Sequence, residues 1–262
     1  MTVKVSRAVA DRASINNTVS AAIDVHGPEV APTLDAILFP GGPPPGVNMA
    51  LFLAAFGNAL RESTTRLQDA DQTHTAELAD DDGYRKNRDG AVGALRGIFI
   101  SLRAALTNNY GPEVASAYGV ASPLPDDAQT LLHSAGTVEK ILRERPLTEP
   151  PIIKGLFVDR ILVADDLKAA AESVKKAIAD VEREKREAQA TLDKKNIEID
   201  AWAKRYPPIA EIVSQLFALA GRHSLADRVK PTTRRRAGLP EETDLPQETP
   251  APAPAPTVEG PA

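Results

Sequence analysis

The chain contains no cysteine among its 262 residues. This absence excludes disulfide frameworks, zinc–thiolate sites, iron–sulfur clusters and cysteine nucleophiles. Aromatic residues are also scarce, at 4% of the sequence, although hydrophobic residues make up 42%. A core made mostly of Ala, Leu, Val and Ile suits close helix packing better than a sheet sandwich, which draws on aromatic residues. The composition therefore favours an all-α protein.

The sequence also lacks a strong excess of charge and a long apolar run. Its formal net charge of −5 gives no general attraction to nucleic acid or to an anionic membrane. The apolar stretch 91–106 is interrupted by Arg96 and Arg103, and the stretch 209–220 is short and contains Glu211. Neither reaches the roughly 20 apolar residues that span a bilayer. Because the start of the chain has no signal-peptide run either, we expect a cytoplasmic protein without a membrane partner.

Familiar catalytic patterns are missing as well. The sequence has no H-E-x-x-H, G-x-S-x-G or G-x-G-x-x-G motif, and no two of its four histidines stand three or four residues apart. We therefore predict a protein that is not an enzyme and that has no cofactor and no metal site. One alternative stays open, in which distant parts of the chain form a ligand pocket near Trp202, Tyr206 and His74.

The stretch from Phe157 to Tyr206 contains neither proline nor glycine and is rich in residues that favour a helix. Its apolar residues recur in steps of three and four, which is the a/d pattern of a coiled coil. Only Lys185 and Lys195 place a charge on this seam. The predicted coiled-coil seam consists of Leu167, Ala171, Val174, Ile178, Val181, Leu192, Ile199 and Trp202.

The remaining helices are predicted from their caps and breaks. Asn48 can cap a helix that ends at the turn 80–83, and a second helix from Tyr84 to Asn109 would return antiparallel to it as a hairpin. Asp126 can cap a further helix that ends near Arg143. The long helix is expected to begin at residue 152 or 156 and to break at residues 206–208, because proline lacks the amide donor. A return helix would follow, with Ser224 capping a last short one.

Four segments follow from this reading. Residues 1–46 form an irregular N-terminal segment with short helices and a Pro/Gly linker, and residues 47–151 form a helical hairpin with short helices. Residues 152–230 form a long coiled-coil helix with its return helix, and residues 231–262 form a disordered Pro/Ala-rich tail. The expected fold is an elongated helical bundle of antiparallel coiled-coil hairpins. Residues 51–120 overlay residues 162–231 at an offset of 111 (162 − 51), which leaves an internal duplication open.

Two hypotheses for function remain. The first is a non-enzymatic interaction or structural protein that uses its long amphipathic helices to bind a protein partner or a second copy of itself. The second is a binding module in which Arg234, Arg235 and Arg236 dock on nucleic acid or on an acidic partner. Nucleic acid is the weaker partner, because acidic residues follow these arginines and no aromatic residues stand between them for base stacking.

Overall fold

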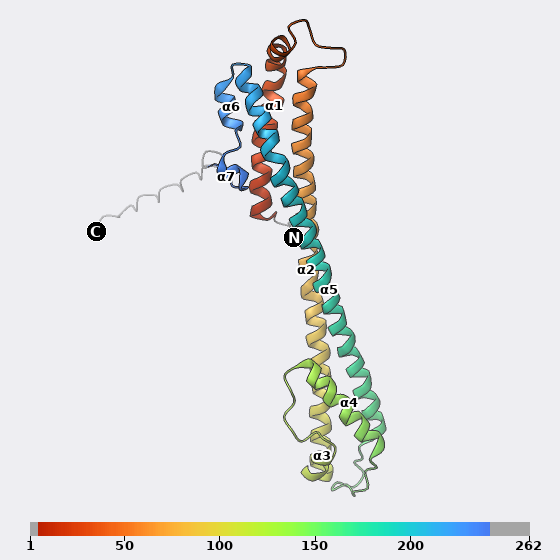
Figure 1. The fold of residues 1–262 in the computed structure, drawn as a ribbon. Coiled ribbons are helices and arrows are strands. Elements are labelled where there is room, and N and C mark those ends of the chain that lie inside the picture. Colours follow the sequence, from red (N-terminus) through yellow and green to blue (C-terminus); the bar gives the residue numbers. More distant parts are fainter. Residues whose placement is uncertain (1–4, 242–262) are drawn as a thin grey trace, which may run out of the picture. The chain divides into compact units, whose positions relative to one another are not determined.

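The computed structural model describes residues 5–241, and all regular structure in this range is helical (Figure 1). The long helices pack antiparallel, α2 with α5 and α1 with α2, so the predicted all-α fold is confirmed. Part of the predicted tail, residues 242–262, lies outside the described residues. The helices are α1 (Arg7–Leu38), α2 (Met49–Tyr110), α3 (Pro112–Ala117), α4 (Ala128–Glu144), α5 (Arg160–Leu219), α6 (His223–Val229) and α7 (Thr233–Arg236).

The chain divides into two compact units. Unit 1 holds the described residues up to Gln72 together with those from Lys194 onward, and unit 2 holds Thr73–Asp193. Each unit therefore contains one part of α2 and one part of α5. These units differ from the four consecutive segments that we expected, because antiparallel helices bring together parts of the chain that are far apart in sequence.

The N-terminal segment is not the irregular region that the sequence indicated. Residues Arg7–Leu38 form one helix, α1, which contains Pro28 and Pro32. Both prolines lie on its exposed side, where water can bind the carbonyl groups that lose their partners. The opposite side buries Ile23, Val30 and Leu34, and this apolar burial outweighs the cost of the two prolines.

Two predicted breaks in the long helices are also wrong. α2 runs through residues 80–83 without a turn, so the predicted hairpin within residues 47–151 does not form. Gly83 costs this helix about 1 kcal/mol relative to alanine. Packing on α5 offsets that cost: the Arg183 guanidinium lies 5.9 Å from the ring centroid of Tyr84.

α5 likewise continues through Pro207 and Pro208. On both sides of the prolines the helix buries large side chains at helical spacing, among them Tyr206 and Phe217. The carbonyl groups of Ala203 and Lys204 lose their amide donors, but both residues are exposed, so water can replace them. Burial of one continuous helix face therefore outweighs the local penalty of the prolines.

The predicted caps agree better with the structure. Asn48 accepts a hydrogen bond from the amide of Ala50 at 2.7 Å, as expected. Asp127, one residue after the predicted cap, accepts from the amide of Thr130. The long helix starts later than predicted, at Arg160, where Asp159 accepts from the amides of the next turn. The residue before α6 is Arg222 rather than the predicted Ser224.

The second half of the chain repeats the helix order of the first. α5 starts 111 residues after α2 (160 − 49), and α6 starts 111 residues after α3 (223 − 112). Several buried positions coincide at the same offset, so these parts of the two halves share one register as well as one order of helices. Pairs that are buried in both halves are Leu53 with Ala164, Ser63 with Val174, Leu95 with Tyr206, Phe99 with Ala210, Leu102 with Val213, Leu106 with Phe217, Ala115 with Ala226 and Tyr118 with Val229.

Candidate interaction site

The predicted coiled-coil seam lies against other helices of the same chain. In unit 2, Leu167, Val174 and Val181 are buried, and in unit 1 Trp202 is buried. The remaining seam residues are half-buried, namely Ala171, Ile178, Leu192 and Ile199. Because α2 packs antiparallel on α5, this seam is occupied within one chain. A partner must therefore bind another surface.

A polar cluster fixes the register of three helices in unit 1. The Asn16 side-chain amide of α1 donates to the carbonyl oxygen of Leu60 at 3.0 Å and to Oγ1 of Thr64 at 2.9 Å, both on α2. Its Oδ1 accepts from Trp202 Nε1 of α5 at 2.9 Å. Asn16 is 1% exposed, and a buried amide with satisfied donors and acceptor specifies one arrangement of its neighbours. The cluster is thus a structural feature rather than a surface for ligands.

A buried ion pair lies close to this cluster along the same helices. Asp71 accepts from the amide and from the hydroxyl of Ser6, both at 2.7 Å, and its Oδ1 lies 2.6 Å from Lys195 Nζ. Burial alone raises the pKa of Asp71, but the hydrogen bonds from Lys195 and Ser6 lower it by more, so the pKa lies below the ordinary value. The charge at seam position Lys195 is therefore matched inside the fold.

The aromatic pair considered for a ligand pocket belongs to the core of unit 1. The rings of Trp202 and Tyr206 stack at 4.9 Å and are 1% and 0% exposed. The Arg12 guanidinium lies 5.2 Å from the Trp202 ring centroid and closes the other side. In unit 2, His74 Nδ1 lies 3.0 Å from Thr191 Oγ1. These residues pack against protein and do not line any of the grooves described below.

The three arginines proposed for acidic partners fold back onto unit 1. α7 contains all of them, and Arg235 is 4% exposed and donates to the carbonyl oxygens of Arg228 and Lys230. Arg234 pairs with Glu241, and Arg236 pairs with Glu211. The predicted tail therefore begins at least ten residues too early (241 − 231), because this segment supplies caps and contacts of its own. Docking on nucleic acid or an acidic surface gains no support from these contacts.

One group of carboxylates in unit 2 could hold a cation. Glu77, Glu184 and Glu187 can each offer one oxygen, and these oxygens all lie within 4.8 Å of one another. Partial burial, followed by the negative charges of Glu187 and Glu184, raises the pKa of Glu77. Arg183 meets part of this charge through a 3.1 Å hydrogen bond to Glu184. Oxygen ligands of this kind suit hard cations such as Ca²⁺, although exposed acidic groups often cluster without one.

An apolar groove, which we call groove 1, lies in unit 1 where α2 begins. Its volume is about 570 Å³, and no charged side chain lines it. Leu51 is 68% exposed and Phe52 is 51% exposed, although both are large apolar residues. The apolar spacing of the sequence did not indicate this groove. The lining residues are Phe39, Gly46, Val47, Asn48, Met49, Leu51, Phe52 and Ala55.

A second apolar groove, groove 2, lies in unit 2 between α2 and the start of α5. Its volume is about 410 Å³, and Asp166 supplies its one charged side chain. Val158, Val163 and Asp166 line it, and they stand 111 residues after Val47, Phe52 and Ala55 of groove 1 (158 − 47). The two grooves therefore share three equivalent positions, although the rest of their linings differ. The other wall of groove 2 is formed by Ala94, Gly97, Ile98, Ser101, Leu102 and Ala105 of α2.

The segment before α5 adds further exposed apolar side chains to unit 2. Phe157 is 75% exposed and Ile152 is 69% exposed. In addition, α2 is long and apolar enough, by length and composition, to be a candidate membrane span, and only 22% of its most apolar window is buried. Sequence analysis did not expect such a helix. An apolar helix surface that the fold leaves open is typical of an interaction site.

Comparisons with known proteins identify no relative of this chain. No family model, curated protein or solved structure matches it.

Proposed function

We propose that this chain is a non-enzymatic interaction protein that binds an apolar helical segment of a partner protein in groove 1. The observation that carries the proposal is the exposure of Leu51 and Phe52 over a groove without charged lining residues. Soluble proteins rarely leave large apolar side chains together at the surface unless something covers them. The internal repeat supports the same conclusion, because an apolar groove in unit 2 includes three positions equivalent to Val47, Phe52 and Ala55.

The long helices would act as the scaffold of this protein. Their seam is occupied within the chain, so they hold the starts of α2 and α5 in place without a partner of their own. Asn48 caps the start of α2, and Asp159 caps the start of α5. Leu51 and Leu162 stand at equivalent positions on the first turns of these helices, and both are exposed. The working surface would therefore be the outer faces of the helices rather than the seam itself.

The chemistry of groove 1 indicates the chemistry of its occupant. Burial of Leu51 and Phe52 by a partner would contribute roughly 1.5–3 kcal/mol for each side chain. A charged occupant would lose its hydration and would find no counter-charge in the lining. We therefore expect leucine-like or aromatic side chains from one face of a partner helix. A cytoplasmic location stays a prediction.

The test places a photo-reactive amino acid at position 51 of the full chain in cells of its source. A matched control carries it at Val25, which is 62% exposed on α1 and lies outside the groove. The proposal expects one protein to cross-link from position 51 and not from position 25. The purified partner should then bind Leu51→Ser at least about tenfold more weakly than it binds Val25→Ser.

Two results would count against this function. Equal cross-linking from both positions would mean that groove 1 has no specific occupant. Flotation of the purified chain with lipid vesicles, lost in Leu51→Ser but kept in Val25→Ser, would assign the groove to a membrane surface instead.

A further inference from the structure

The outer face of α2 in unit 2 carries a second set of heptad positions that the fold leaves open. Gly90, Gly93, Gly97, Ile100 and Ala104 follow one another in steps of three and four, and all are exposed. Ile100 is 58% exposed. The buried positions of the same helix, such as Leu95, Phe99 and Leu102, lie on its other side. This part of α2 is thus apolar or small on both faces, and only one face is covered.

The three glycines on this face are not required by close packing within the described residues. None has a positive φ, and a Cβ atom at Gly90, Gly93 or Gly97 would meet no atom within 4 Å. Each costs the helix about 1 kcal/mol relative to alanine. Glycines on one helix face allow another helix backbone to approach closely. The space that they leave is therefore available to a molecule from outside the chain.

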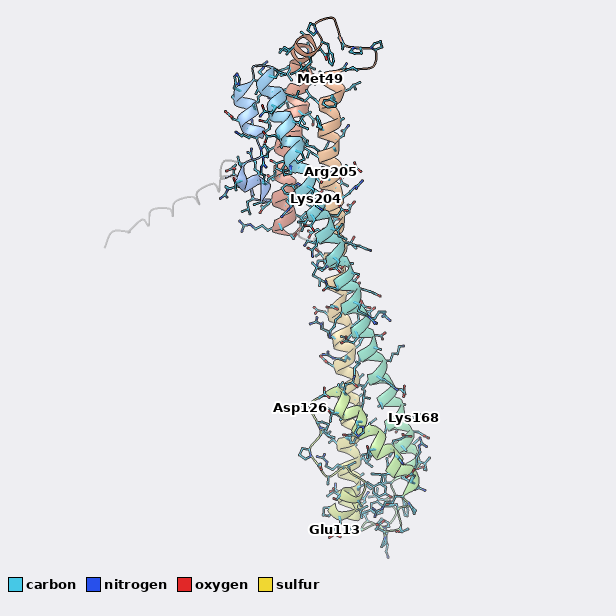
Figure 2. All side chains as sticks on the ribbon, in the orientation of Figure 1. Met49, Glu113, Asp126, Lys168, Lys204 and Arg205 are labelled. Atoms are coloured by element: carbon cyan, nitrogen blue, oxygen red, sulfur yellow. The ribbon has the colours of Figure 1, made fainter. Side chains whose placement is uncertain are left out.

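The internal repeat supplies a comparison for the same face. The equivalent positions of α5 in unit 1 are occupied by Ala201, Lys204, Pro208, Glu211 and Gln215. Lys204, Pro208 and Gln215 are exposed on this face, and Figure 2 labels Lys204. Glu211 is half-buried and pairs with Arg236. Two helices with the same buried register thus differ on their outer faces, one polar and one apolar with glycines. The difference indicates that only the face in unit 2 is covered in the working protein.

The charges of this part of α2 are turned away from the open face. Arg96 donates to the carbonyl oxygen of Pro125 at 2.6 Å and lies 3.4 Å from Asp126, which Figure 2 labels. Arg103 donates to the carbonyl oxygens of Val120 and Ser122. Both arginines therefore belong to contacts with the connection between α3 and α4. Between Gly90 and Ala104, α2 itself therefore presents no charge on the open face, whereas Asp166 of α5 lines groove 2 together with Gly97.

We propose that a second copy of this chain covers this face, with the two α2 helices antiparallel about a two-fold axis at Gly97. The spacing is self-complementary, because this arrangement puts Ile100 of each copy over Gly93 of the other and Ala104 over Gly90. A large side chain thus enters the space beside a glycine twice, once on each side of the axis. An interface between identical surfaces requires this match of a projection with a hollow on the same patch.

The area of the open face and the placement of its charged residue Lys86 agree with a second copy of the chain as the occupant. From Lys86 to Thr107 the face is about 32 Å long, and with the adjoining turns of α5 it is about two helices wide. This gives roughly 600 Å² for each copy, which reaches the lower limit of specific interfaces. The same pairing places Lys86 beside the C-terminal end of the second α2. The carbonyl groups at a helix C-terminus attract a cation such as Lys86, and the Tyr110 hydroxyl at that end accepts a hydrogen bond from the amide of Val158 at 3.4 Å.

The test measures the mass of the full chain by light scattering over a concentration series. Wild type is expected to be a dimer, and Gly93→Ile should weaken dimerisation at least about tenfold, because it fills the hollow that Ile100 enters. Ile100→Ala should weaken dimerisation as well. The double variant G93I/I100A exchanges projection and hollow and should restore the dimer. Lys204→Ile, at the equivalent position in unit 1, is the control and should leave the dimer intact.

Several outcomes would overturn the proposal. A monomeric wild type, including one that binds lipid vesicles through this face, would mean that something other than a second copy covers it. A dimer that persists in Gly93→Ile would place the interface elsewhere. Failure of the double variant to recover would contradict the antiparallel register. The circular dichroism spectrum of each variant checks folding, and the open space at Gly93 predicts no change in it. The proposal does not depend on groove 1, so it can fail independently of the proposed function.

Discussion

Lys195 and Asp71 form an ion pair at 2.6 Å, and their side chains are 14% and 1% exposed. Lys195→Met removes one partner and leaves a buried carboxylate that keeps its hydrogen bonds from Ser6. We expect a loss of about 3 kcal/mol in the free energy of unfolding, at the lower end of such losses because Ser6 remains. Lys185→Met is the control, since the exposed Lys185 pairs only with Glu182 and should change stability by less than about 0.5 kcal/mol. Urea unfolding of both variants measures the difference, and equal losses would contradict the assignment.

The same carboxylate predicts part of the acid sensitivity of the protein. Because the pKa of Asp71 is lower in the folded chain than in the unfolded chain, the unfolded state binds more protons between the two pKa values. Asp71 therefore stabilises the fold above its unfolded pKa of about 3.9, and this stabilisation is lost as the pH falls through the lower, folded pKa. In Asp71→Asn the stability should be lower at pH 7 and should fall less steeply in acid. If the stability of this variant fell with pH as steeply as that of wild type, Asp71 would have no part in the acid sensitivity.

Glu77 predicts a pH dependence of the opposite sign. Its pKa is raised in the folded chain, so the folded state binds more protons between the unfolded pKa of about 4.3 and the folded value. Stability should therefore fall as the pH rises through this window, and the penalty should persist above it. Glu77→Gln should raise the melting temperature at pH 7 and flatten this part of the profile. Glu172→Gln is the control, because it removes an exposed pair with Lys175 and should not raise the melting temperature.

Gly238 lies so close to the Arg12 guanidinium that an added side chain would displace it. Its φ is +78°, and an added Cβ would lie 2.7 Å from the Arg12 Cζ. Gly221 has a similar φ of +76°, but an added Cβ there would meet open space. Gly221→Ala therefore measures the cost of backbone strain without the clash. We expect Gly221→Ala to cost about 1 kcal/mol and Gly238→Ala at least about 2 kcal/mol. Denaturant unfolding gives both values, and equal costs would mean that Arg12 simply moves aside.

The sequence predicted what depends on local chemistry. The spacing of Leu167, Val174 and Val181 gave the buried face of α5, and Asn48 gave a cap that forms as predicted. Both observations depend on residues within one or two turns of each other. The all-α fold followed from the same patterns.

The sequence could not show where tertiary packing would continue a helix through residues that usually end one. Pro207, Pro208 and Gly83 are ordinary signals for the end of a helix, yet α5 and α2 continue through them because faces far apart in sequence cover each other. The grooves were missed for the same reason. In the linear sequence Leu51 and Ile100 are simply apolar residues of a helix, and only the packed structure shows that nothing in the described chain covers them.

The central claim is that the seam closes within one chain and that copies meet at the outer face of α2 in unit 2. Because the chain has no cysteine, Gly97→Cys provides a single reporter at the proposed two-fold axis. Two such cysteines would face each other across the axis, within the range of a disulfide. Mild oxidation of this variant should give a disulfide-linked dimer in high yield, and Gly136→Cys, an exposed position on α4, should not. Equal and low cross-linking of the two variants would contradict the claim.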